Sequence, residues 1–215
     1  MTEHPIIMNG ESVRAILAGR KSQTRRVIKP QPTGYGLVWI ENDCGFAAWQ
    51  DDGLLLDEGS QRLCPHGRVG DLLWVRETWA NVWNGEDASD GEHVEYRADL
   101  PAGCTDYPGQ WPAEYAIGSN DAPKWRASIH MPRRASRVTL RITDVRVQTV
   151  QEIGYDDIIA EGWDVRRDAP VTDGTCGYDA REWFRRLWDG INAKRGYPWA
   201  VDPWVFAITF QVFDK

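Results

Sequence analysis

The chain passes from a helix into a strand within one basic segment, Gly19-Arg20-Lys21-Ser22-Gln23-Thr24-Arg25-Arg26. Three residues before it have the apolar spacing of a helix face: Val13, Ile16 and Leu17. Gly19 is the expected stop of that helix, because glycine accepts the left-handed conformation found after a helix end. Residues 24–29 are expected to form a strand that ends before Pro30. The segment therefore places cations and hydroxyl groups at the junction of two elements.

Further strands and helices are expected on both sides of this segment. Patterns typical of strands occupy residues 6–8, 37–40, 54–56, 72–77, 94–97, 138–147 and 204–213. Helices are expected at residues 156–161, before Gly162, and at residues 179–194. Strands near both ends, with short helices between strands, indicate an α+β fold in which a curled mixed or antiparallel sheet carries its helices on the outside.

The rest of the chain predicts loops rather than a second domain. Residues 30–69 and 80–127 are rich in glycine and proline, and we interpret them as two loop-rich insertions in one domain that spans residues 1–215. A chain of 215 residues can bury a sizeable core without disulfides or metals. We therefore expect one elaborated domain.

Composition excludes some functions. The formal net charge is −7, which argues against a protein that coats long nucleic acid, although it allows a local basic pocket for one nucleotide. The 12 tryptophans are expected mainly in the core, and a few near the basic segment are candidates for stacking on a base.

Cysteine spacing and hydropathy set the expected compartment. The four cysteines form no Cys-x-x-Cys pair, and Cys64-Pro65-His66 has no partner at zinc-finger spacing, so we expect neither a metal nor another cofactor. The first eight residues lack an apolar signal core, and no apolar run approaches membrane-spanning length. We expect a cytoplasmic protein that does not bind membranes.

The basic segment has two interpretations. A run of charges is most often a solvated turn. However, a helix followed by Gly-x-Lys, a hydroxyl group three residues after the lysine and then arginine resembles the ASCH domain family. Residues 70–75, 138–147 and 204–210 and the short helix ending at Glu161 resemble that family in the same order. Residues 70–79 and 128–133 look like its larger members from phages and prophages, and the insertions are not covered in detail.

The resemblance implies a fold and an activity. It implies a PUA-like β-barrel, a fold related to RNA-binding domains. One branch of the family resembles bacterial amidohydrolases that remove the acyl group from N4-acetylcytidine with a lysine, a threonine and a glutamate. Lys21 and Thr24 match the first two, and the hydroxyl group of Thr24 favours this branch because many ASCH domains carry an acid there. Glu161 is the match for the glutamate, with Glu77 as its competitor.

The implied chemistry is physically reasonable. Threonine becomes a nucleophile when a base removes its proton, and a lysine whose pKa is lowered by burial can be that base. Since Lys21 and Thr24 are three residues apart, we expect one turn to bring the amine and the hydroxyl group together. The expected substrate-binding residues are Arg20, Arg25, Arg26, Trp74, Arg76, Glu77, His130 and Arg133.

Alternatives to the hydrolase remain at this point. The same cleft suits a noncatalytic module that binds RNA or modified nucleic acid, or a nuclease. A phage accessory protein that binds a host protein is a further reading. For the hydrolase, the binding module and the nuclease, the expected partner is a nucleoside or a short single strand of nucleic acid.

Overall fold

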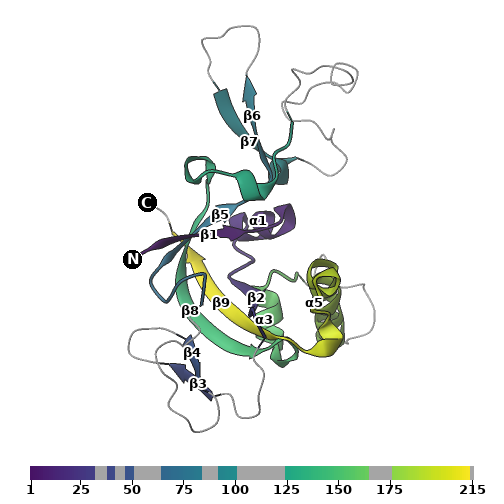
Figure 1. The fold of residues 1–215 in the computed structure, drawn as a ribbon. Coiled ribbons are helices and arrows are strands. Elements are labelled where there is room, and N and C mark those ends of the chain that lie inside the picture. Colours follow the sequence, from purple (N-terminus) through teal and green to yellow (C-terminus); the bar gives the residue numbers. More distant parts are fainter. Residues whose placement is uncertain are drawn as a thin grey trace.

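A computed structural model of the chain describes residues 1–31, 38–41, 47–50, 64–83, 92–100, 124–164 and 176–213 (Figure 1). The protein combines helices with a main sheet and two small hairpins, so the predicted α+β class is confirmed. No helix in these ranges is both long enough and apolar enough to cross a membrane.

The main sheet has five strands. In spatial order they are β1 (Glu3–Ile7), β5 (Leu72–Arg76), β8 (Thr139–Thr149), β9 (Trp204–Val212) and β2 (Gln23–Val27). β1 and β5 are parallel, and the other neighbours are antiparallel. The hairpins pair β3 (Val38–Glu41) with β4 (Ala47–Gln50), and β6 (Trp79–Trp83) with β7 (Glu92–Tyr96).

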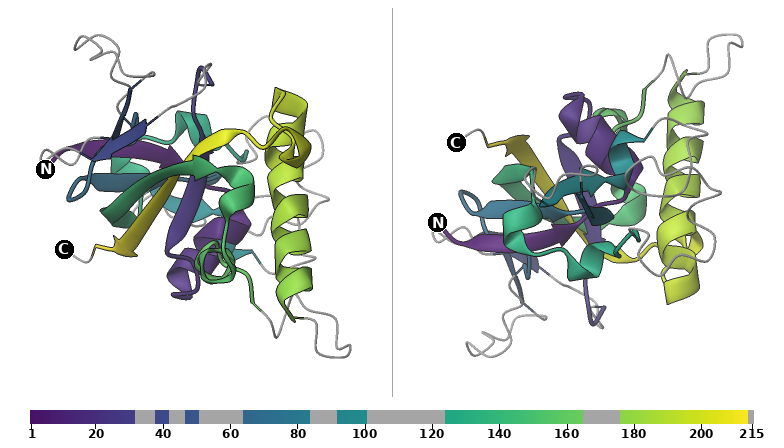
Figure 2. Two further views of the ribbon diagram at one scale, coloured as in Figure 1. Left: turned by 90° about the horizontal axis from the view of Figure 1, so that it is seen from below. Right: turned by 90° about the horizontal axis from the view of Figure 1, so that it is seen from above.

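The described residues include three α-helices beside the sheet: α1 (Gly10–Leu17), α3 (Tyr155–Ala160) and α5 (Cys176–Asn192). Both views of Figure 2 place α5 along one side of the molecule, next to the sheet. The short 3₁₀ helices are η2 (Arg97–Asp99), η4 (Ser128–His130), η5 (Arg133–Ala135), η6 (Val150–Glu152), η7 (Ala193–Arg195) and η8 (Trp199–Val201).

The sheet does not close into a barrel. β1 and β2 are its two edge strands, and no backbone ladder joins them within the described residues. Among the described residues, the Arg26 side chain spans this gap: one of its Nη atoms donates a hydrogen bond of 2.7 Å to the carbonyl oxygen of Ile7. We call the gap between β1 and β2 the seam of the sheet.

Two clusters of buried apolar residues lie on opposite sides of β9. The main core includes Phe206, Ile208 and Phe210, which alternate along the strand as predicted. Val205, from the other face, is buried against α3 and α5. Both faces of β9 therefore carry buried residues, because helices cover the second face.

Most predicted elements near the site are present. The helix stop at Gly19 has a φ of +69°, and Gly162 after α3 has a φ of +106°, so both glycines adopt the left-handed conformation. The strand expected at residues 138–147 is present as β8 (Thr139–Thr149), with an irregular register between Ile142 and Asp144. The strand expected at residues 54–56 lies outside the described residues.

Candidate functional site

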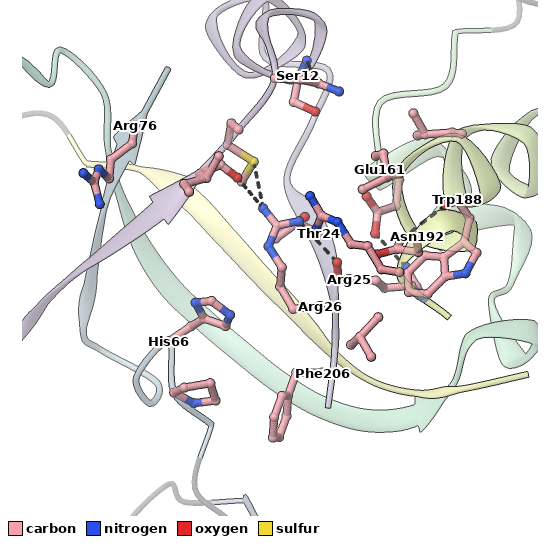
Figure 3. A pocket seen from close by; sticks show the side chains of 18 of the residues that line it. Ser12, Thr24, Arg25, Arg26, His66, Arg76, Glu161, Trp188, Asn192 and Phe206 are labelled. Atoms are coloured by element: carbon pink, nitrogen blue, oxygen red, sulfur yellow. Dashed lines mark hydrogen bonds and ion pairs between the residues drawn. The ribbon is translucent and has the colours of Figure 1, made fainter. Parts of the chain in front are cut away.

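A cavity of about 1070 Å³ lies at the seam between β1 and β2 (Figure 3). Pockets that hold small molecules measure roughly 300–1,000 Å³, so this volume suits a ligand of drug-like size. The cavity is cationic although the whole chain carries a net charge of −7. Its described lining includes six cations and one carboxylate: Lys21, Arg25, Arg26, Lys29, Arg76, Arg195 and Glu161.

A buried ion-pair cluster forms one part of the wall. The Lys21 amine donates hydrogen bonds of 2.6 Å to the Glu161 carboxylate and 2.8 Å to the Glu161 carbonyl oxygen. Arg25 donates a 3.2 Å hydrogen bond to the other oxygen of the same carboxylate. Glu161 follows the last turn of α3 as its C-cap, so α3 and the segment before β2 jointly build this contact. We call Lys21, Arg25, Glu161 and Asp157 the Glu161 cluster.

Asp157 completes that cluster from the first turn of α3. It accepts hydrogen bonds from Arg25 at 2.8 Å, Arg146 at 2.9 Å and Gln23 at 3.0 Å. Burial alone would raise the pKa of Asp157, but the hydrogen bonds from Arg146 and Gln23 and the charges of the two arginines outweigh burial and hold this pKa below its usual value. The charges on this wall are therefore mutually compensated.

Lys21 is poised between two opposing effects. Burial lowers the pKa of its amine, while the charge of Glu161 and its hydrogen bond raise it. Burial is the larger effect, so the pKa lies below the ordinary lysine value of 10.5. A buried lysine of this kind holds its proton less tightly than a solvated one, as a general base requires.

Thr24 lines the same cavity without touching Lys21. It is buried, yet among the described residues its hydroxyl group makes no hydrogen bond. The expected direct contact between the Lys21 amine and the Thr24 hydroxyl group is not made. Lys21 precedes the strand that contains Thr24, and its amine is bonded to Glu161 at the end of α3 instead.

A second part of the wall carries cations that have no carboxylate partner among the described residues. We call them the unpaired cations: Arg26, Lys29, Arg76 and Arg195. Arg26 donates only to the carbonyl oxygens of Arg25 and Ile7 and to the sulfur of Met8. Lys29 and Arg76 lie over the rings of Tyr197 and Trp74, at 5.3 Å from each ring centroid.

Among the unpaired cations, the charged form of Arg26 is disfavoured by its surroundings. Burial lowers the pKa of Arg26, Glu161 opposes this, and the charge of Arg195 lowers it further, so the net direction is downward. Burial, followed by the charges of Arg26 and His4, lowers the pKa of His66 to about 4. His66 also lines the cavity and is neutral at pH 7. This wall would gain most from an anion.

An apolar surface from α5 faces these polar walls. The helix turns one side toward the cavity: Phe184, Leu187, Trp188 and Ile191. Trp188 is fixed by a 2.9 Å hydrogen bond from its indole N–H to the carbonyl oxygen of Tyr197. Phe206 of β9 adds a further ring. A flat apolar group with an attached anion would match both surfaces.

The cavity contains some, but not all, of the residues that the sequence suggested. Lys21, Thr24 and Glu161 line it, as do Arg25, Arg26 and Arg76. The other five are not among its lining residues: Arg20, Trp74, Glu77, His130 and Arg133.

The residues outside the cavity have structural partners or are solvated. Arg20 donates to the carbonyl oxygen of Gly162, and Arg133 pairs with Glu3. Glu77 is paired with Arg137 at 2.9 Å, so the structure brings Glu161, rather than Glu77, to Lys21. His130 is exposed.

Other residues of the site were not anticipated as such. Asp157 meets both Arg25 and Arg146 because β8, α3 and β2 pack together, and local sequence does not specify that packing. His66 was noted only in a cysteine motif, and the α5 surface only as a helix face. A signal for α5 existed, since Trp188 and Ile191 are aromatic or large apolar residues one turn apart.

Metal-binding side chains do not cluster in the described parts of the chain. Within them no group of three or more histidine, cysteine, aspartate or glutamate side chains could hold an ion. Burial, opposed by a backbone hydrogen bond at His66, raises the pKa of Cys64 to about 11, so this thiol is protonated at neutral pH.

Comparison with known proteins adds no identity. No protein-family model, curated protein or solved structure matches the chain. The fold and the site define an α+β protein with a cationic cavity at the seam of an open sheet. The cavity and the basic segment are therefore the grounds on which a function is proposed.

Proposed function

We propose that the protein is an amidohydrolase that removes the acyl group from N4-acylated cytosine nucleosides such as N4-acetylcytidine. The observation that carries the proposal is the meeting of three residues in one cavity. Lys21 and Thr24 come from one segment and Glu161 from a distant part of the chain, and all three line the cavity. The same three residues carry the resemblance of the sequence to the ASCH amidohydrolases, and we propose that the chain is a divergent member of that PUA-like group.

The proposed reaction begins with the Thr24 hydroxyl group. Its oxygen attacks the acyl carbonyl carbon, and its proton passes to the neutral Lys21 amine. Because the two groups are not hydrogen-bonded to each other, one water molecule relays the proton between them. Burial, which lowers the pKa of Lys21, supports a neutral amine in this role.

Collapse of the tetrahedral intermediate completes the first half. The C–N bond breaks, the 4-amino nitrogen of cytosine takes the proton from Lys21, and the acyl group stays on Thr24 as an ester. Water then attacks the ester carbonyl carbon while Lys21 accepts a proton from it. The C–O bond to Thr24 breaks, Lys21 returns the proton to the Thr24 oxygen, and the carboxylic acid is released. The Arg26 guanidinium, on the same face of β2 as Thr24, supplies donors for the developing oxyanion.

Glu161 acts through Lys21. Its carboxylate holds the amine at 2.6 Å and fixes its position in the wall. It also limits how far burial can lower the pKa of Lys21, since an adjacent carboxylate favours the charged amine. Glu161 is therefore a positioning residue in this scheme.

The test is turnover by the purified protein. Incubation with N4-acetylcytidine should produce cytidine and acetate. The loss of the acyl-cytosine absorbance measures this reaction. A panel of longer N4-acyl groups tests the size of the acyl site. No turnover of any member of the panel would contradict the proposal.

A second candidate function is noncatalytic binding of RNA or modified nucleic acid. The observation that favours it is the set of unpaired cations beside the apolar α5 surface. Salt-dependent binding of oligonucleotides that is unchanged by Thr24→Ala, without turnover of any acylated cytosine, would favour this function over the hydrolase.

A further inference from the structure

The geometry points to a phosphate-binding subsite formed by Arg26 and Arg76, so that the ligand of the cavity is a phosphorylated nucleotide rather than a free nucleoside. This inference deepens the proposed function and rests on it only for the identity of the base and its acyl group. The phosphate site itself stands on the geometry of the seam.

Arg26 and Arg76 both line the cavity, from the two sides of the seam. Ile7, the last residue of β1, is in register with Arg76 on β5. The carbonyl oxygen of Ile7 accepts the 2.7 Å hydrogen bond from Arg26 on β2. One residue of β1 thus has an arginine on either side, and both arginines line the cavity. Adjacent strands are only about 4.8 Å apart, which places Arg76 next to Ile7.

Both guanidinium groups keep donors for a ligand. Within the described residues neither has a carboxylate partner. Arg76 donates from one Nη to the carbonyl oxygen of Ile129, and its buried Nε has no hydrogen-bond partner. Arg26 uses part of its five N–H donors on the carbonyl oxygens of Arg25 and Ile7. Arginine is the side chain best suited to bidentate recognition of phosphate.

The electrostatic balance favours an anion of this kind. Burial lowers the pKa of Arg26, which means that its charge is poorly solvated. His66 is neutral and can donate an N–H without adding a third charge. A phosphate group would compensate charges that the described chain leaves uncompensated. The contrast with Arg25 is informative, because Arg25 already has Asp157 and Glu161 as partners.

The position of the subsite fits a nucleotide. In Figure 3, Arg26 lies between Arg76 and Glu161, with Trp188 on the Glu161 side. A base held near Glu161 and the α5 surface therefore directs its sugar phosphate toward Arg26 and Arg76. A cavity of about 1070 Å³ has room for a mononucleotide.

Calorimetric titration with cytidine 5′-monophosphate and with cytidine tests the subsite without requiring turnover. We expect the monophosphate to bind about ten- to a hundredfold more tightly, the range that charged hydrogen bonds give. Arg76→Gln and Arg26→Gln should each reduce this preference to below about threefold. Arg186→Gln is the matched control, since Arg186 is an exposed residue of α5 paired with Glu182. It should keep the full preference.

Arg26→Lys guards against a folding defect. It keeps the charge and loses the bidentate fork, so an intermediate preference is expected if the protein folds. A titration with tetracytidylate separates two sources of phosphate. Tighter binding of the strand than of the monophosphate supports the subsite and identifies a phosphodiester as its ligand. Tighter binding of the monophosphate supports it and identifies a terminal phosphate.

The results also separate this inference from the proposed function. Equal binding of cytidine and its monophosphate, or an equal loss in Arg186→Gln, overturns the phosphate subsite. Turnover of N4-acetylcytidine with no gain from a 5′-phosphate leaves the hydrolase standing and removes the subsite. Phosphate preference that depends on Arg26 and Arg76, without turnover of either acylated compound, supports the subsite and removes the hydrolase.

Discussion

The two cationic walls of the cavity differ in how their charge is balanced. In the Glu161 cluster, each cation has a carboxylate within about hydrogen-bonding distance, as Lys21 does with Glu161 at 2.6 Å. The unpaired cations have ring or carbonyl neighbours instead, such as Tyr197 beneath Lys29. The charges of the first wall are compensated within the protein, whereas the second wall has no carboxylate partner among the described residues. This difference in charge balance distinguishes the side that we propose to be catalytic from the side that we propose to bind the anionic part of a ligand.

The largest expected effect tests the proposed catalytic role of Thr24, which lines the same cavity as the Glu161 cluster. Thr24→Ala should reduce turnover of an N4-acylated cytosine by at least about 10²–10⁴-fold, because the nucleophile is lost. Thermal unfolding should change little, since the hydroxyl group makes no hydrogen bond to the described residues. Ser22→Ala is the control: Ser22 is exposed, two residues away and not among the lining residues. Equal activity of both variants would exclude Thr24 as the nucleophile.

A stability measurement then compares the two walls directly. Glu161→Gln should lower the free energy of unfolding by about 3–5 kcal/mol, because it leaves buried Lys21 without a charge partner and removes one of the two carboxylates paired with Arg25. Arg76→Gln should cost less than about 1.5 kcal/mol, the usual worth of a hydrogen bond, since no ion pair is lost.

Urea unfolding at pH 7 gives both values. Asp156→Asn, an exposed change on α3 next to the cluster, should cost less than about 1 kcal/mol. If the two walls respond alike to loss of a charge, the distinction between them is wrong.

An increase in salt concentration should affect the two walls differently, and this effect should be smaller than the difference in stability described above. Raising sodium chloride from about 0.05 to 0.5 M should weaken binding of cytidine 5′-monophosphate by up to about tenfold, because partly exposed cations are screened. The destabilisation caused by Glu161→Gln should stay nearly constant, because the Lys21–Glu161 pair is buried. Titrations and unfolding curves at matched salt concentrations check both. Salt-independent binding of the monophosphate would mean that the unpaired cations do not contact it.

The smallest expected effect is on His66. Burial and then the charge of Arg26 lower its pKa to about 4, so Arg26→Gln should move this pKa upward, toward 6.5. Since the folded-state pKa lies below the unfolded value, the stability from neutral His66 is complete above pH 6.5 and is lost as pH falls toward 4. Arg26→Gln should therefore reduce the loss of stability in this window.

NMR titration of the His66 ring protons, assigned with His66→Gln, measures the pKa. Arg195→Gln provides the comparison, because Arg195 lines the same cavity and is exposed, and its charge is not among the causes of the His66 shift. An unchanged His66 midpoint in Arg26→Gln would show that burial alone keeps this imidazole neutral.

The sequence was sufficient where local physical chemistry decides the structure. Gly19 predicted the helix end, because the left-handed conformation there favours glycine. The alternation of Phe206, Ile208 and Phe210 predicted the strand β9 and its core face. Lys21 and Glu161 were paired by the resemblance, and they lie in contact across 140 positions of the chain.

The sequence was insufficient where packing between distant elements decides. Asp157 meets Arg25 because β2 pairs with β9 and α3 packs beside them, and no local pattern encodes that arrangement. The Lys21 amine likewise bonds to Glu161, which is distant in sequence, and not to the hydroxyl group of nearby Thr24. Whether the sheet closes depends on how edge strands approach, so the expected barrel was replaced by an open sheet.

The seam has a mechanical consequence. Strands joined by a backbone ladder keep a fixed spacing of about 4.8 Å, whereas among the described residues β1 and β2 are linked by a hydrogen bond from the Arg26 side chain to the carbonyl oxygen of Ile7. Losing this hydrogen bond breaks the link without breaking any backbone ladder of the sheet. A ligand that competes with Ile7 for the guanidinium group therefore weakens the link, so that ligand binding in the cavity and separation of the two edge strands are thermodynamically coupled.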